Sequence, residues 1–176
     1  MTSRCRVPYV ILDSFQTERT DYSMDYEIVN LEKKTAVGIQ ARTSNLSPDM
    51  GAVIGGLWQR FFGEGLFFAV PEKANAKSIG LYSNYSDDMN EYDVTVCCEV
   101  EHAETVADGL TVAEIPAGKY AKFVVQGNMV TAVHDFWTQL HKIDLPRAYT
   151  ADFEEYQNAD ENNAVIHIYI SLKNES

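Results

Sequence analysis

The spacing of hydrophobic and polar residues follows the same order twice along residues 24–176. Residues 26–43 contain two apolar runs, split by the turn-like sequence Glu32-Lys33-Lys34, and residues 50–62 then carry apolar side chains at helical spacing. Residues 79–85 and 92–100 follow, and alternate positions of the second segment are apolar. The first half therefore predicts the order strand, helix, strand, strand.

The second half repeats this order with shorter loops. Residues 111–126 form an apolar stretch broken by Pro116-Ala117-Gly118, and a helix is predicted over residues 130–141. A short segment at 152–156 precedes the last strand at 165–172. The two predicted helices carry matching aromatic motifs around Trp58 and Trp137. This tandem duplication predicts an α+β fold, in which two β-α-β-β units form one pseudo-twofold antiparallel-sheet domain with two main helices and a central cleft.

The duplication also suggests boundaries within the chain. The two repeats are expected at about 24–103 and 104–176, while residues 1–23 are polar and irregular and are predicted to be an N-terminal extension. No segment approaches the roughly 20 apolar residues needed to cross a bilayer, and no signal-peptide cleavage pattern is present. Three cysteines form no disulfide framework, so we expect a cytoplasmic protein.

Composition narrows the classes of partner. A formal net charge of −12 would repel a phosphate backbone, so direct nucleic-acid binding is not expected, although the charge alone is typical of a solvated acidic surface. His134 and His141 have no cysteine or carboxylate at ligand spacing, and no nucleotide-binding or hydrolase motif occurs. Neither a metal nor a cofactor is therefore predicted.

Four short motifs, in order along the two repeats, resemble the GyrI-like family of small-molecule-binding domains. They are TAVGIQART at 35–43, IGLY at 79–82, IPAGKYAKF at 115–123 (a hairpin in the family) and DFEEY at 152–156. The family includes the effector-binding domains of AraC-type and MerR-type multidrug-responsive regulators. The resemblance covers roughly residues 25–173 and includes no helix-turn-helix segment, so this chain is similar to the stand-alone members.

The resemblance implies a ligand site at the cleft between the repeats. In regulators of this family, the glutamate of the last motif lies at the pocket floor and pairs with a positively charged ligand, which implies that role for Glu154. A buried carboxylate is costly unless a cation compensates it, whereas a solvated Glu154 would have no such role. Strand alternation places Glu155 on the opposite face.

Aromatic side chains are expected to form the walls of this site. Rings at such spacing also fit an ordinary core, but the pseudo-twofold arrangement brings both helices to one cleft, where cation–π contacts favour positively charged ligands. The predicted ligand-binding residues besides Glu154 are Tyr156, Trp58, Tyr82, Tyr120, Trp137 and Tyr169.

Three functions follow from these residues and from the resemblance. The first is a stand-alone small-molecule-binding domain for lipophilic, cationic aromatic compounds. The second is a GyrI-like hydrolase of strained electrophilic rings in toxic natural products, with Glu154 positioning or deprotonating water. The third is an inhibitor of a DNA-processing enzyme, as the gyrase-inhibitor resemblance implies. A DNA-binding regulator or gyrase would then be the protein partner.

Overall fold

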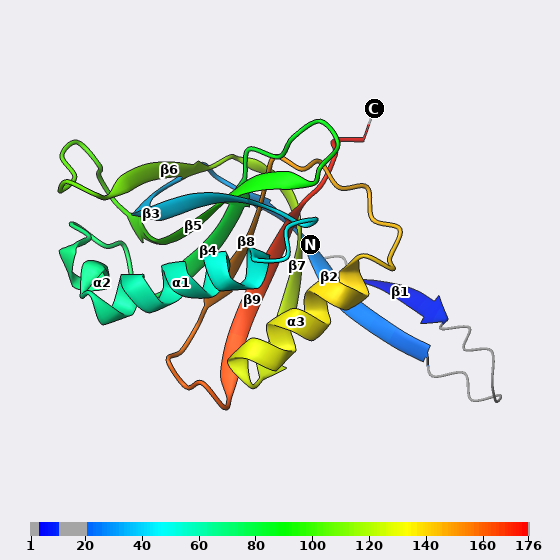
Figure 1. Cartoon of the computed structure of the whole chain (residues 1–176). Helices are drawn as coiled ribbons and strands as arrows, with labels where there is room; N and C mark the ends of the chain where they lie inside the picture. Colours follow the sequence, from blue (N-terminus) through cyan, green and yellow to red (C-terminus); the bar gives the residue numbers. More distant parts are fainter. Residues whose placement is uncertain (1–3, 11–20, 176) are drawn as a thin grey trace.

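The chain folds around one antiparallel sheet with helices on one of its faces (Figure 1). The computed structural model describes the backbone of residues 4–10 and 21–175 and the side chains of residues 24–175. The strands in these residues are β1 (Arg4–Val10), β2 (Asp21–Leu31), β3 (Lys34–Ser44), β4 (Ser78–Ser83), β5 (Glu91–Val100), β6 (Thr111–Ile115), β7 (Gly118–Gly127), β8 (Ala151–Tyr156) and β9 (Ala164–Ser171). The helices are α1 (Met50–Gly63), α2 (Leu66–Ala69) and α3 (Met129–Leu140).

The sheet order reveals the duplication directly. The nine described strands are ordered β1-β2-β7-β9-β8-β4-β5-β3-β6. Read outward from the centre, β8-β9-β7 on one side corresponds to β4-β5-β3 on the other, so the repeats meet where β8 pairs with β4. The predicted α+β fold built from two β-α-β-β units is confirmed.

Each repeat donates one strand to the other half of the sheet. β2 precedes β3 in the chain but pairs with β7, whereas β6 precedes β7 but pairs with β3. Leu31 at the end of β2 lies opposite Gly118, and Lys34 at the start of β3 lies opposite Ile115. The segment predicted to be a hairpin at 115–123 therefore joins strands that pair with different halves.

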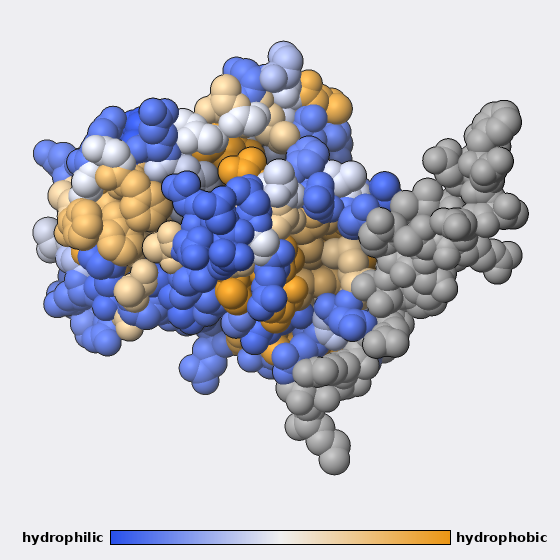
Figure 2. Space-filling view, turned by 90° about the horizontal axis from the view of Figure 1, so that it is seen from below, coloured by the Kyte–Doolittle hydropathy of each residue, from blue (hydrophilic) through white to orange (hydrophobic). Residues whose placement is uncertain are grey.

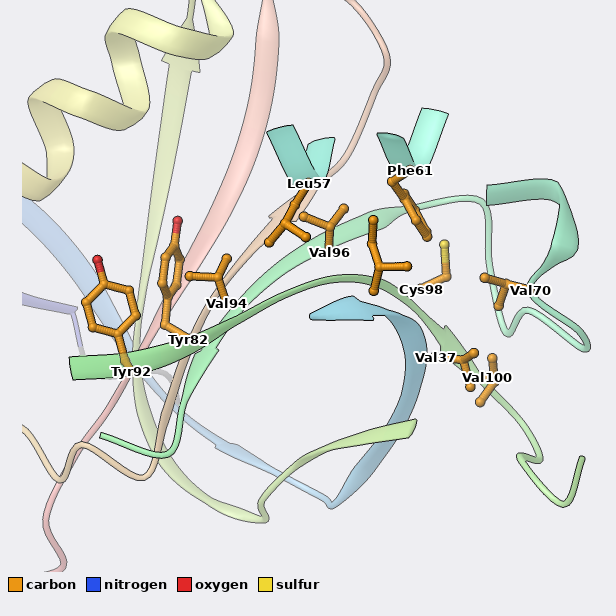
Figure 3. Close-up of a cluster of buried hydrophobic side chains, with 11 residues drawn as sticks. Val37, Leu57, Phe61, Val70, Tyr82, Tyr92, Val94, Val96, Cys98 and Val100 are labelled. Atoms are coloured by element: carbon orange, nitrogen blue, oxygen red, sulfur yellow. The ribbon is translucent and has the colours of Figure 1, made fainter. Parts of the chain in front are cut away.

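The two long helices cover the same face of the sheet, each over its own repeat (Figure 1). Leu57 and Phe61 of α1 point toward the valines of β5, as Figure 3 shows, and Phe136 and Leu140 of α3 pack on the isoleucines of β9. Trp58 and Trp137 contact both of these cores. The gap between the helices thus lies above β4 and β8.

A third apolar cluster lies on the other face of the sheet. Its buried residues include Ile79, Leu81, Ile115 and Phe153, and residues of β2 and β6 pack against them. Gly38 in β3 permits a close approach here, because a Cβ atom at this position would lie 1.9 Å from the carbonyl oxygen of Val96. With apolar packing on both sides, all six residues of β8 are buried.

The start of the chain differs from the expectation. Residues 1–23 were predicted to be irregular, but Arg4–Val10 forms β1 and pairs with the first half of β2, which itself begins at Asp21. Arg4–Val10 is a strand because its backbone pairs with β2. Residues 1–3 and 11–20 of the predicted extension lie outside the described residues, and the division at residue 23 stays a prediction. None of the described helices is long and apolar enough to cross a membrane.

Candidate functional site

Glu154 lies at the centre of the sheet, at the junction of the two repeats. Alternation along β8 directs Asp152, Glu154 and Tyr156 toward the helices and Phe153 and Glu155 toward the other face. Only 1% of Glu154 is exposed. Across the central strand pair, Glu154 faces Gly80 of β4.

Glu155 has a different environment, as strand alternation predicts. Its carboxylate lies 3.3 Å from the Lys77 ammonium and accepts a 2.7 Å hydrogen bond from the Gln157 amide. This pair gives Glu155 a counter-charge within the protein, and the adjacent Glu154 has none among residues 24–175.

Three donors surround the Glu154 carboxylate. Oε1 accepts hydrogen bonds from Trp137 Nε1 at 2.7 Å and from the Tyr82 hydroxyl at 3.0 Å. Oε2 accepts one from the Tyr156 hydroxyl at 2.8 Å. Within residues 24–175, no lysine, arginine or histidine forms an ion pair with Glu154. The site is therefore a buried acid held by neutral donors.

The electrostatics of these groups follow from burial. Desolvation raises the pKa of Glu154 above its ordinary value, and the hydrogen bonds from Trp137, Tyr156 and Tyr82 lower it in part. Burial and the nearby carboxylate also raise the pKa values of Tyr82 and Tyr156, so both hydroxyls keep their protons and act as donors. A positive charge brought to this position would offset the desolvation of Glu154.

The two helices contribute equivalent tryptophans that make different contacts. Trp137 of α3 donates to Glu154 and packs edge-on against Tyr82, with ring centroids 5.2 Å apart. Trp58 of α1 packs edge-on against Tyr156 at 4.9 Å, and its indole N–H donates no hydrogen bond within residues 24–175. Glu154, Tyr82, Tyr156, Trp137 and Trp58 are together called the Glu154 cluster below.

Gly80 leaves the space in which this cluster packs. A Cβ atom on Gly80 would lie 3.1 Å from both Glu154 Oε2 and Trp58 Cζ2. Those separations are too short for a comfortable contact, so glycine at this position lets the carboxylate and the indole lie close to the backbone of β4.

Five of the seven predicted ligand-binding residues thus come together, and two do not. Tyr120 and Tyr169 lie on the other face of the sheet, where Tyr169 stacks on Phe153 at 4.5 Å and the Tyr120 hydroxyl donates to the Pro116 carbonyl. The prediction that these two line the same cleft is wrong. Alternation in β7 and β9 directs their neighbours, rather than these tyrosines, toward the helices.

A second buried acid was missed in the sequence. Asp152 is fully buried and accepts hydrogen bonds from Arg147 Nη2 at 2.5 Å, Tyr85 at 2.8 Å and the backbone N–H of Ser171 at 2.8 Å. Its place two residues before Glu154 was a usable signal, because alternation puts both side chains on one face. Arg147 makes Asp152 a paired, structural acid.

Two surface depressions lie elsewhere. One of about 510 Å³ is bordered by Thr35, His102 and Glu114, and one of about 390 Å³ by Arg42, Ser47 and Glu91. Neither is lined by a residue of the Glu154 cluster.

A duplicated α+β sheet with a buried acid between its two helices defines an effector-binding domain of the GyrI-like type. The chain belongs to the Cass2 family, the integron-associated effector binding proteins, whose family model matches residues 27–172. The resemblance inferred from the four motifs is therefore confirmed. A comparison with curated proteins gives no match.

Solved structures share this fold. An integron cassette protein from the mobile metagenome of Vibrio cholerae is 28% identical, with a TM-score of 0.68 over 84% of this chain and 95% of that one. The protein SAV2435, solved with tetraphenylphosphonium bound, is 22% identical, with a TM-score of 0.73 over 85% and 94%. A putative transcription regulation protein from Staphylococcus aureus is also 22% identical, with a TM-score of 0.70 over 86% and 99%.

Proposed function

We propose that this effector-binding domain takes lipophilic aromatic cations and that Glu154 is their counter-ion. The observation that carries the proposal is a carboxylate with 1% exposure and no basic partner in residues 24–175, two positions from an acid that has one. A buried charge without a counter-charge is unfavourable, and a bound cation would remove that penalty. Relief of this desolvation cost on binding would favour positively charged ligands.

The rings of the cluster set the rest of the ligand's chemistry. Tyr82, Tyr156 and both tryptophans present faces and edges within a few ångströms of the acid, which suits a cation carrying aromatic groups. Each well-placed cation–π contact is worth about 0.5–2 kcal/mol. The tetraphenylphosphonium bound to SAV2435 is such a cation, on the same fold.

The hydrolase hypothesis is less well supported. Hydrolysis would require a water molecule beside Glu154, yet both carboxylate oxygens already accept hydrogen bonds from protein donors and the residue is 1% exposed. Turnover of a cyclopropane- or epoxide-bearing compound, lost in Glu154→Gln, would favour this function over binding. Inhibition of a DNA-processing enzyme stays a prediction, to be measured with a supercoiling assay.

The test of the proposal uses two ions of the same shape and opposite charge. Tetraphenylphosphonium and tetraphenylborate are titrated calorimetrically into the protein and into Glu154→Gln. We expect the substitution to weaken the phosphonium at least about tenfold, equivalent to about 1.4 kcal/mol, and to leave the borate unchanged or tighter. Glu155→Gln is the matched control and should change neither. Equal losses for both ions would contradict charge pairing by Glu154.

A further inference from the structure

We propose that Trp58 occupies the position of the ligand's aromatic ring in the free protein, and that binding displaces it. This inference rests on the proposed cation site and identifies Trp58 as a residue that determines which cations bind. Because only 1% of Glu154 is exposed, a ligand reaches the carboxylate only after a side chain of the Glu154 cluster moves.

The side chains around Glu154 are not equally held. Tyr82, Tyr156 and Trp137 each donate a hydrogen bond to the carboxylate. Moving any of them leaves a buried acceptor without that donor, which is unfavourable. Trp58 makes apolar and ring contacts and its side chain is partly exposed, and its displacement breaks no hydrogen bond to another residue of 24–175.

The position of Trp58 is also the one a ligand needs. Its Cζ2 atom and Glu154 Oε2 are equally close to the bare face of Gly80, so the indole edge fills the space beside the acid. An aromatic ring of the ligand placed there would contact Tyr156 as Trp58 does now. The indole and the ligand ring therefore compete for one space.

A neighbouring aromatic surface lies against the indole in the free protein. Phe62, one helical turn after Trp58, is 48% exposed and lies nearly parallel to the indole, at 8° and a centroid distance of 6.2 Å. Phe62 in turn stacks on Phe67 of α2 at 5.3 Å, and Phe68 beside it is 80% exposed. Figure 2 shows the apolar surface over α2.

Competition with Trp58 selects for ligand size. When a ligand binds only a rearranged form of the protein, its apparent Kd is the intrinsic Kd divided by the fraction of molecules in that form. A large aromatic cation replaces the lost ring contacts with its own, whereas a small aliphatic cation does not. Trp58 thus excludes small cations from a carboxylate that would otherwise attract them.

The experiment compares tetraphenylphosphonium with tetraethylammonium on Trp58→Ala. We expect the Kd of tetraethylammonium to fall at least about fivefold and the association rate of tetraphenylphosphonium to rise, because the competing ring is gone. Phe68→Ala, whose ring makes no contact with Trp58, is the control and should change neither. Weaker binding of both cations by Trp58→Ala would show that Trp58 is a fixed wall and would overturn the inference.

Phe62→Ala provides a second test. Because Phe62 is half exposed, its removal leaves no large cavity in the core. It removes the ring that stacks on Trp58. We expect it to lower the Kd of tetraethylammonium and to raise the association rate of tetraphenylphosphonium, as Trp58→Ala does, by smaller factors. In Trp137→Phe, Trp58 is the only tryptophan, and saturating tetraphenylphosphonium should move its emission to longer wavelength as the indole enters water. An unchanged or shorter wavelength would contradict displacement.

Failure of this inference differs from failure of the proposed function. If the unsubstituted protein binds tetraphenylphosphonium through Glu154 but Trp58→Ala weakens binding, only the role of Trp58 is wrong. If the unsubstituted protein binds neither cation, or if Glu154→Gln has no effect on binding, the proposed function itself is wrong.

Discussion

Asp152 and Glu154 lie two residues apart on the same face of β8, and in the part of the chain with described side chains only Asp152 has a basic partner. Removing the Asp152 charge leaves Arg147, whose side chain is 10% exposed, buried without its counter-ion. We expect Asp152→Asn to lower the free energy of unfolding by about 3–5 kcal/mol. Urea denaturation at neutral pH measures the loss. Glu154→Gln, which strands no cation, should cost little in the same experiment, and equal losses would contradict the distinction between the two acids.

Glu154 should make the stability of the free protein depend on pH. Burial raises its folded-state pKa above the unfolded value, so the folded protein binds the proton more tightly. The contribution of Glu154 to stability is therefore fully present below the unfolded pKa and is lost as the pH rises through the folded pKa. The stability of the protein relative to Glu154→Gln should fall over that window, as measured by urea denaturation at a series of pH values. A constant difference would show that the pKa is not raised.

Binding of a cation should have the opposite pH dependence. The ionised form of Glu154 is the one that attracts a positive ligand, so affinity for tetraphenylphosphonium should rise with pH through the raised pKa and then level off. Trp137→Phe removes one hydrogen bond that lowers this pKa, and the midpoint should then move to higher pH. Trp58→Phe is the matched control from the other repeat, since Trp58 donates no hydrogen bond to Glu154, and it should leave the midpoint in place.

Gly80→Ala should weaken both the site and the fold. The new methyl group would lie 3.1 Å from Glu154 Oε2 and from Trp58 Cζ2, in the space proposed for the ligand. We expect tetraphenylphosphonium to bind at least about threefold more weakly and the free energy of unfolding to fall by about 1–3 kcal/mol. Gly55→Ala in α1, where a Cβ atom meets nothing within 4 Å, should instead stabilise the protein by about 0.4–1 kcal/mol. Unchanged cation binding by Gly80→Ala would place the ligand elsewhere.

The local pattern of the sequence predicted the features that depend on neighbouring residues. Helical spacing placed a helix at 50–62, and the structure has α1 at Met50–Gly63. Strand alternation separated Glu154 from Glu155, because the direction of successive side chains follows from the extended backbone. The matching tryptophans of the two repeats indicated that both helices lie beside the same site at the junction of the repeats.

Features that depend on distant pairing were not visible in the sequence. Whether Tyr120 and Tyr169 face the helices depends on how β7 and β9 join the sheet, and periodicity alone assigns no absolute face to a strand that is apolar on both sides. The pairing of Arg147 with Asp152 arises from the loop before β8, which has no periodic pattern. The exchange of β2 and β6 between the halves has no local signal either.

That exchange makes folding of the two halves interdependent. β2 belongs to the first repeat in the chain but lies between β1 and β7 in the sheet, and β6 from the other repeat forms the edge beside β3. If one half unfolds, it withdraws a strand from its neighbour and exposes that neighbour's backbone hydrogen-bonding groups. A chain cut between the repeats would give two fragments, each carrying a strand whose partner lies on the other fragment. We therefore expect the duplicated domain to unfold as one cooperative unit, with the Glu154 cluster lost in the same step.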